Sequence, residues 1–200
     1  MQIALSGVSY AYPSAADPIL NNVSVTFPRG WTGLFGDNGC GKTTLAKIAC
    51  GLIEPDTGSV TRGLFAIMCA QETDIAPDGL ADFALDFGRE AREVRRIFRI
   101  EDDMPWRYAE LSCGEQKKLQ VATALWQRPD ALVLDEPTNH IDHAAREQLA
   151  CALRRFDGIG ILVSHDRELL DALADRCASF EAGKLVVRPG GYTAAHGQAE

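Results

Sequence analysis

The stretch Gly36–Thr44 constrains this chain more than any other feature of the sequence. It reads G-D-N-G-C-G-K-T-T and fits the pattern G-x-x-x-x-G-K-S/T of a phosphate-binding loop. Apolar residues 31–35 precede it and predict a short buried strand; residues 44–51 follow it and predict a helix that ends at Gly51. The alternative is a glycine-rich turn with a chance lysine, but such a match is roughly a 1% event at ordinary residue frequencies. The sequence therefore predicts nucleotide binding.

Each residue type in the loop has an expected role. Glycines let the backbone curl so that successive N–H groups point at phosphate oxygens, and the helix N-terminus adds partial positive charge. Lys42 would reach the β- and γ-phosphates of ATP, and Thr43 would offer its hydroxyl to Mg²⁺. The residues expected to bind the nucleotide are Gly36, Asp37, Asn38, Gly39, Cys40, Gly41, Lys42, Thr43 and Thr44.

Length and composition limit the possible classes of protein. Two hundred residues suit one domain, or one domain with sub-lobes. The net charge of −8 disfavours a surface that grips nucleic acid all over, although a local basic patch stays possible. The six cysteines form no C-x-x-C pair, which favours a reducing cytoplasm. No signal peptide is recognisable and no apolar run approaches the ~18 residues that span a bilayer, so any membrane role is expected to need a partner.

Hydrophobic periodicity predicts strands alternating with helices along the rest of the chain. Strands at 2–12 and 19–27 are expected to pair as an antiparallel β-lobe. Residues 72–110 are rich in Asp, Glu and Arg, and predict two or three helices of a small helical lobe that extends to about residue 128. Further strands are expected at 59–62, 64–70, 131–134, 159–163, 177–181 and 184–187, with helices at 79–87, 90–100, 116–127, 143–156 and 167–175.

This alternation predicts an α/β fold with a parallel sheet and right-handed crossovers. We expect one domain over residues 1–193. The polar residues 194–200 are interpreted as the start of a linker or a free tail.

Polar side chains follow several apolar strands, where an open α/β sheet binds its ligands. Asp135 is suited to hold Mg²⁺ through water, and the adjacent Glu136 could polarise the attacking water. A solvated turn is the alternative for this pair. His165 ends the next apolar strand and is expected at the γ-phosphate; Gln71 ends another, and its amide could reach Mg²⁺ and the water.

Tyr12 lies about thirty residues before the loop lysine, where a tyrosine can stack on an adenine ring. The alternative is an aromatic side chain that packs on the β-lobe, and this alternative is stronger for Tyr10 than for Tyr12.

In chain order, these motifs resemble those of ABC ATPases. Gly36–Thr44, Gln71, Leu132–Glu136 and His165 resemble the Walker A motif, the Q-loop, the Walker B motif and the switch histidine. A further segment resembles the family signature: Leu111, Ser112, Cys113, Gly114, Glu115 and Gln116. The resemblance covers nearly the whole chain and implies a P-loop NTPase fold with an ABC-type core. It implies Mg²⁺-dependent hydrolysis of ATP, with Glu136 and His165 catalytic, Tyr12 on the adenine, and Thr43, Gln71 and Asp135 around the metal.

The family resemblance also implies a composite site. In ABC ATPases the signature of a second domain closes over the γ-phosphate, so Ser112 and Gly114 would serve a nucleotide held by another copy or by a tandem domain. Two positions depart from the usual pattern: Cys113 stands where the family has Gly, and Cys40 where it often has Ser.

One segment narrows the resemblance further. Residues 136–142 read E-P-T-N-H-I-D and resemble the E-P-T-N-H-L-D segment of the ABC-F branch, whose members act on ribosomes. Ser164–Arg167 and Gly190–Tyr192 also resemble that branch, although the short helical segment leaves no room for the longer arm that ABC-F proteins often insert. One alternative is the ATP-binding subunit of a membrane transporter, with the helical lobe docked on a membrane partner. Another is a binding module that does not hydrolyse ATP, against which the intact Glu136 and His165 argue.

Overall fold

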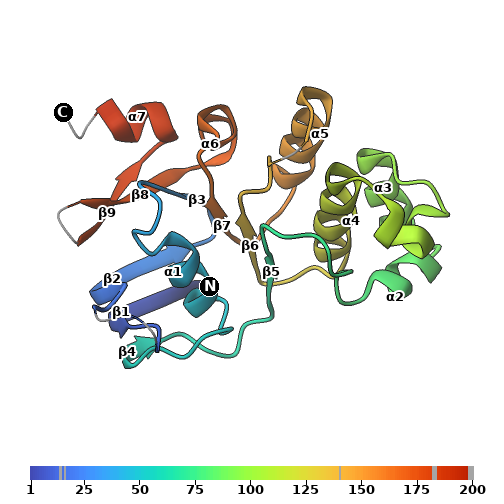
Figure 1. The fold of residues 1–200 in the computed structure, drawn as a ribbon. Coiled ribbons are helices and arrows are strands. Elements are labelled where there is room, and N and C mark those ends of the chain that lie inside the picture. Colours follow the sequence, from blue (N-terminus) through green and yellow to red (C-terminus); the bar gives the residue numbers. More distant parts are fainter. Residues whose placement is uncertain (14, 16, 140, 182–183, 198–200) are drawn as a thin grey trace.

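The computed structural model describes residues 1–197 except 14, 16, 140, 182 and 183. A β-lobe with helix α1 lies at one end, a six-stranded sheet runs through the middle, and a group of helices forms the other end (Figure 1). No helix in the described part of the chain is long and apolar enough to cross a membrane.

The β-lobe is an antiparallel sheet of three strands in the order β2-β1-β4. Strands β1 (Gln2–Tyr10) and β2 (Leu20–Pro28) pair as predicted. The third strand, β4 (Thr57–Val60), pairs with β1 and starts two residues before the expected position. Alternate residues of β1 and β2 are buried and pack with α1 (Lys42–Ala49), which places the phosphate-binding loop between this lobe and the central sheet.

The central sheet has the order β5-β6-β7-β3-β8-β9. Its first five members run parallel, and β9 pairs antiparallel to β8 as the predicted hairpin, whose turn at residues 182–183 lies outside the described residues. The strands are β3 (Gly30–Phe35), β5 (Ala66–Cys69), β6 (Ala131–Asp135), β7 (Ile159–Val163), β8 (Arg176–Glu181) and β9 (Lys184–Pro189). The predicted parallel α/β sheet is therefore confirmed.

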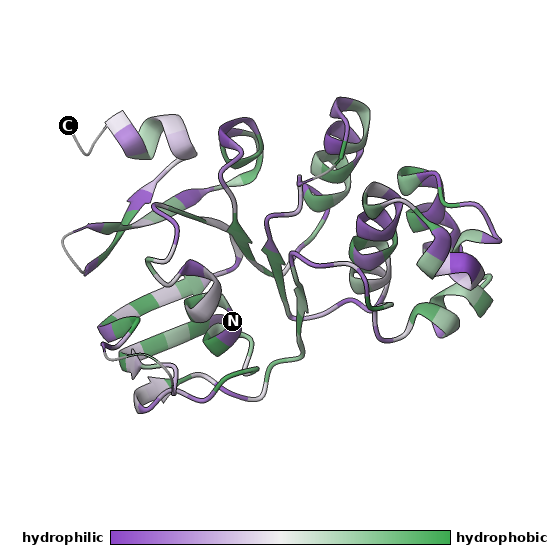
Figure 2. Ribbon diagram, viewed as in Figure 1, coloured by the Kyte–Doolittle hydropathy of each residue, from purple (hydrophilic) through white to green (hydrophobic). Residues whose placement is uncertain are grey.

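Both faces of the sheet are covered, which explains the continuous apolar runs of β6 and β7 (Figure 2). Val133 and Ile161 face α1 and the β-lobe. Leu132 and Leu162 face the other way, toward α4 (Cys113–Trp126), α5 (His143–Leu153) and α6 (Arg167–Leu173). The parallel strands end together, so the residues after β3, β5, β6 and β7 meet at one edge.

The helical lobe consists of α2 (Leu80–Leu85), α3 (Arg89–Phe98), the 3₁₀ segment η1 (Met104–Glu110) and α4. Phe83 and Phe98 are fully buried within it, and Val94 and Ile97 pack against the same core. Arg95 is 8% exposed and ties α3 to the end of α2 by donating to the carbonyl oxygens of Phe83, Ala84 and Asp86.

The ends of several elements differ from expectation. Helix α5 stops at Leu153 instead of residue 156, because Phe156 turns back to pack 5.7 Å from the Trp31 ring. Residues 194–197, expected as a polar tail, belong to helix α7 (Tyr192–Gly197). That helix is anchored by buried Ala195 and by the Tyr192 ring, 4.9 Å from the Phe35 ring.

Candidate active site

A cavity of about 550 Å³ lies at the carboxyl edge of the parallel strands. It is lined by residues of the phosphate-binding loop, of β-lobe turns and of the segments after β5, β6 and β7: Tyr12, Ile19, Asn38, Gly39, Gly41, Lys42, Thr43, Thr44, Gln71, Asp135, Glu136, Asn139, Val163 and His165. The chain thus gathers nearly all of its predicted nucleotide, metal and catalytic residues around one cavity.

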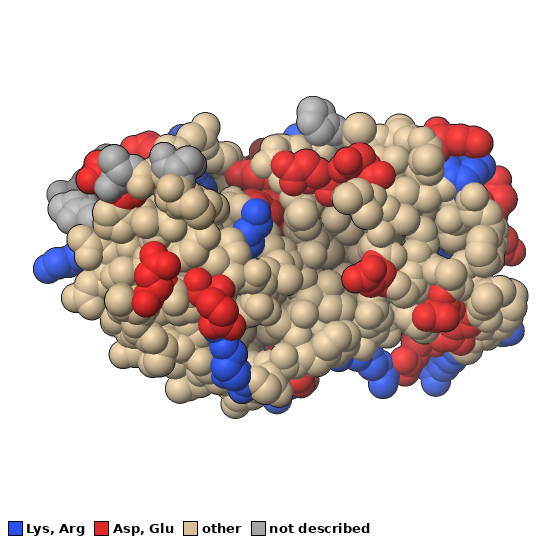
Figure 3. Space-filling model, turned by 60° about the horizontal axis from the view of Figure 1, so that its bottom comes forward, with Lys and Arg blue, Asp and Glu red and all other residues tan. Residues whose placement is uncertain are grey.

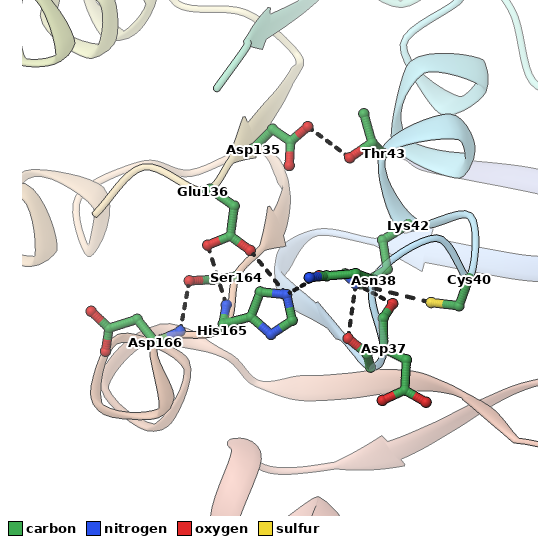
Figure 4. Close-up of polar contacts among 11 residues, drawn as sticks. Asp37, Asn38, Cys40, Lys42, Thr43, Asp135, Glu136, Ser164, His165 and Asp166 are labelled. Atoms are coloured by element: carbon green, nitrogen blue, oxygen red, sulfur yellow. Dashed lines mark hydrogen bonds and ion pairs between the residues drawn. The ribbon is translucent and has the colours of Figure 1, made fainter. Parts of the chain in front are cut away.

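The phosphate-binding loop requires glycine at its junction with α1. Gly41 has φ 101°, and a Cβ there would lie 2.8 Å from the Leu20 side chain and 3.1 Å from the Ile19 carbonyl oxygen. Lys42 Nζ donates to the carbonyl oxygens of Gly36 and Asp37, each at 2.8 Å, and lies 4.0 Å from Cys40 Sγ. Gly36, Asp37 and Cys40 therefore surround the lysine ammonium instead of lining the cavity, and hold it beside the loop (Figure 4).

Thr43 and Asp135 form the part of the site suited to a metal ion. Thr43 Oγ1 donates to Asp135 Oδ2 at 2.9 Å, so a hydroxyl and a carboxylate from different elements meet (Figure 4). Burial raises the pKa of Asp135, and the hydrogen bond from Thr43 opposes that effect. Among the described residues no group of three or more His, Cys, Asp or Glu side chains could hold a metal. The hydroxyl oxygen of Thr43 and the carboxylate of Asp135, with Gln71 lining the same cavity, fit Mg²⁺, because this ion keeps several water ligands and needs few from the protein.

Glu136 and His165 come together from neighbouring strands β6 and β7. The His165 backbone N–H donates to Glu136 Oε2 at 3.3 Å, and His165 Nε2 lies 3.6 Å from Glu136 Oε1. The same ring nitrogen lies 3.1 Å from Asn38 Oδ1, which joins the histidine to the phosphate-binding loop (Figure 4). Burial raises the pKa of Glu136, and the hydrogen bond and the nearby His165 oppose that effect. A carboxylate with a raised pKa is a stronger base.

The backbone at Glu136 is unusual, with φ 46° in a non-glycine residue. Its N–H nevertheless continues the β6–β7 ladder by donating to the Val163 carbonyl oxygen at 2.8 Å. Residues in this region of φ/ψ cluster at functional sites, where the surrounding structure holds them. Here the turn aims the carboxylate at the histidine.

Tyr12 lines the cavity and is 38% exposed. Its hydroxyl lies 3.0 Å from Thr44 Oγ1, and its ring meets the Tyr10 ring edge-on at 5.1 Å. Tyr12 therefore packs against Tyr10, as the alternative expects, and also lines the cavity, while its stacking on an adenine ring stays a prediction.

The signature residues lie apart from this cavity, at the start of α4. Ser112 caps the helix in a reciprocal pair with Glu115, and Cys113 is exposed. Leu111 and Gln116 are buried in the helical lobe, where Gln116 Nε2 donates to the Tyr108 carbonyl oxygen at 3.0 Å. None of residues 111–116 lines the cavity. Within the described residues, the signature therefore lies apart from the predicted metal and catalytic residues.

Sequence reasoning missed two polar residues, one that lines the cavity and one that lies behind it. Asn139 lines the cavity from the segment after β6, and the segment's position beside Glu136 is the signal that could have found it. His140 of the same segment lies outside the described residues. The buried Lys117, which binds the segment carrying Gln71, gave no signal, because a lysine after the signature reads as a surface residue.

Comparison with known proteins identifies the family. A family model described as ABC transporter matches residues 20–139. The chain is 35% identical over 190 residues to the ATP-binding protein Uup of Caulobacter vibrioides, covering 92% of this chain and 31% of that protein. It is 32% identical to a putative ABC transporter ATP-binding protein of Nitratidesulfovibrio vulgaris, covering 89% of this chain and 74% of that protein. It is also 32% identical to the aliphatic sulfonates import ATP-binding protein SsuB 1 of Burkholderia cenocepacia, covering 92% of this chain and 63% of that protein. The chain thus spans about a third of the length of Uup.

Solved structures share the fold. One, of the ATP-binding subunit of an ABC transporter, superposes with a TM-score of 0.80 at 20% identity and covers 94% of this chain and 90% of its own. Another, a dimeric post-hydrolysis state of the ATP-binding cassette MJ0796 bound to ADP and phosphate, gives a TM-score of 0.77 at 20% identity and covers 94% and 98%. The chain therefore belongs to the ABC transporter family, as an ATP-binding domain of the family's ATPases.

Proposed function

We propose that this domain is of the ABC-F type, acts in the cytoplasm, and couples ATP-driven closure with a second ABC domain to a task on the ribosome. The observation that carries the proposal is the segment 136–142, which reads E-P-T-N-H-I-D and resembles the E-P-T-N-H-L-D segment of that branch. Glu136 and Asn139 of this segment line the cavity, so the resemblance lies at the site itself. The similarity to Uup supports the same branch.

Different residues of the cavity would have different roles in ATP hydrolysis. Lys42 and the loop N–H groups would bind the β- and γ-phosphates. Thr43, Asp135 and Gln71 would hold Mg²⁺, which supplies charge neutralisation on the phosphate oxygens when bound. Glu136 would accept a proton from the attacking water, and His165, fixed by Asn38, would hold the γ-phosphate.

The signature would complete the site of another domain. Ser112 and Gly114 lie at the N-terminus of α4, outside the cavity of their own chain. Backbone N–H groups at such a terminus suit a phosphate presented by a second copy or a tandem domain. Binding of ATP would then close two domains, and hydrolysis would reopen them.

The second candidate function is the ATP-binding subunit of a membrane transporter. The similarity to SsuB 1 favours it, and so do exposed apolar side chains at the helical lobe. Ile75, Leu85 and Phe87 are 79%, 62% and 63% exposed, which suits a surface that docks on another protein.

A basic stripe on α3 favours the ribosomal proposal. Arg89, Arg92 and Arg96 recur at spacings of three and four residues, so they share the solvent face of the helix. The exposed Arg99, the residue directly after the helix, is the fourth arginine of the stripe. Glu90 and Glu93 point elsewhere, to Arg128 and Arg155, and no described residue forms an ion pair with the four stripe arginines. The face of the molecule drawn in Figure 3 carries many acidic side chains, with both charges mixed at the end formed by the helical lobe. Unpaired guanidinium groups in a row suit RNA phosphates.

Ribosome co-sedimentation in the presence of ATP tests the proposal. Replacing Arg89, Arg92 and Arg96 together with Gln is expected to weaken ribosome binding. The slope of log K against log salt is negative, and its magnitude is expected to fall by about 2, since each phosphate contact contributes about 0.7–0.9. The control replaces three exposed cations outside α3 with Gln, namely Arg62, which is paired with Glu54, Arg154 and Lys184, and is expected to bind within about twofold of the unmodified chain. Failure of the unmodified chain to bind ribosomes, with co-purification of a membrane protein, would favour the transporter alternative.

A further inference from the structure

The segment that carries Gln71 is held almost entirely by side chains of the signature helix and the turn before it. Residues 71–76 make no backbone-to-backbone hydrogen bond with any described residue. Instead, the carbonyl oxygens of four consecutive residues, 70–73, each accept a hydrogen bond from a side chain of η1 or α4. The path of this segment therefore depends on donors from another part of the sequence.

Lys117 is the principal donor. It is 3% exposed, and its Nζ lies 2.5 Å from the Ala70 carbonyl oxygen, 3.1 Å from that of Gln71 and 2.9 Å from Gln120 Oε1. The three N–H donors of the ammonium thus each have an acceptor. Burial lowers the pKa of Lys117, as expected for a cation in the interior.

Neighbouring side chains extend the same contact. Gln120 Nε2 donates to the Glu72 carbonyl oxygen at 3.4 Å, and the Tyr108 hydroxyl donates to that of Thr73 at 2.7 Å. Thr73 Oγ1 in turn donates to Gln116 Oε1 at 2.9 Å. Gln116 and Gln120 are both 8% exposed. Buried and mutually satisfied polar groups of this kind hold one arrangement, because each lost partner leaves another group unpaired.

The two sides of this contact belong to two different nucleotide sites. Gln71 lines the cavity of its own chain, whereas the start of α4 carries Ser112 and Gly114, assigned above to the nucleotide of a second domain. Lys117 lies five residues after Ser112, hence within about a turn and a half of that end of the helix. A displacement of Gln71 would thus shift the signature end of α4, and a displacement of the signature would shift Gln71.

We infer that Lys117 is a positioning residue of the ATPase: it fixes Gln71 at the cavity and couples that position to the signature end of α4. The coupling rests on the proposed roles of Gln71 and of the signature. A methionine at this position would fill the space of the lysine stem but would donate nothing to three acceptors.

Lys117→Met, compared with Lys118→Met, tests the inference. Lys118 is the next residue of the same helix, and its side chain makes no hydrogen bond or ion pair with described residues. In the nucleotide-free protein, Lys117→Met is expected to speed cleavage after the exposed Glu72 by a glutamate-specific protease by about tenfold or more, with cleavage after the exposed Glu147 of α5 unchanged. The kcat for ATP is expected to fall by about tenfold with KM within about twofold, because the nucleotide contacts remain. Lys118→Met is expected to change neither property.

Three results would overturn the inference: cleavage after Glu72 at the rate of Lys118→Met, cleavage that speeds equally after Glu72 and Glu147, or faster cleavage after Glu72 with an unchanged kcat. Should Lys117→Met not fold, Tyr108→Phe removes only the donor to the Thr73 carbonyl oxygen and is expected to speed cleavage after Glu72 by a smaller factor. The cleavage measurement needs neither a ribosome nor a second domain, so failure of the proposed function is distinguishable from failure of this inference.

Discussion

Replacing Glu136 with glutamine is expected to lower kcat for ATP hydrolysis by about 10²–10⁴-fold, the range that a positioned general base contributes. The glutamine amide keeps the shape of the side chain and can still accept the hydrogen bond from the His165 backbone N–H, but it cannot take a proton from water. The affinity for ATP should stay within about twofold, because only the chemical step loses an interaction. Steady-state turnover and equilibrium titration with a fluorescent ATP analogue measure the two quantities.

Glu147→Gln is the matched control for that variant. Glu147 is exposed on α5 and makes no hydrogen bond or ion pair with described residues, so its replacement should leave turnover unchanged. If Glu136→Gln hydrolyses ATP at the rate of the control, Glu136 is not the base. If the proposed opening of the closed pair requires hydrolysis, Glu136→Gln should also accumulate as an ATP-bound dimer.

Replacing Lys42 with methionine is expected to weaken ATP binding by about 100-fold, which corresponds to about 2.7 kcal/mol and lies within the range for hydrogen bonds to a charged group. In the structure the Lys42 ammonium is held at 2.8 Å from each of two loop carbonyl oxygens, next to the candidate phosphate site. Methionine keeps the apolar stem but removes the charge and all three donors. Nucleotide titration at constant ionic strength measures the change.

Lys184→Met is the control, because Lys184 is exposed on β9 and does not line the cavity. Its affinity for ATP is expected to stay within about threefold of the unmodified chain, since charges between exposed groups are screened by salt. Equal affinities of the Lys42→Met and unmodified proteins would remove Lys42 from the phosphate site.

The central sheet and the site edge could be predicted from the sequence because their signals are local. Strands β6 and β7 are buried on both faces and therefore read as unbroken apolar runs. Since parallel strands end at one edge, Asp135, Glu136 and His165 had to meet. By contrast, β4 is a short strand with mostly exposed residues, and α7 has a single buried residue, so neither left a hydrophobic pattern that would fix its limits.

The partners of the site residues could not be predicted, because they depend on contacts between distant segments. Asn38 and His165 are 127 positions apart, and only the pairing of β3 with β7 brings them to 3.1 Å. Lys117 shows the same limitation in a helix: its periodicity gives no reason to bury a lysine, and the acceptors at residues 70–71 become visible only when α4 packs on β5.

The specific ATPase activity of the purified chain, measured over about a thousand-fold range of protein concentration at saturating Mg-ATP, tests the composite site most directly. The signature residues lie outside the cavity of their own chain, so a single copy holds the phosphate-binding loop without the contacts of Ser112 and Gly114. We expect the specific activity to rise with concentration and to reach a plateau where dimers predominate, with Glu136→Gln as the blank. A specific activity that stays constant over the whole range, from a protein shown to be monomeric by analytical ultracentrifugation, would contradict the composite site.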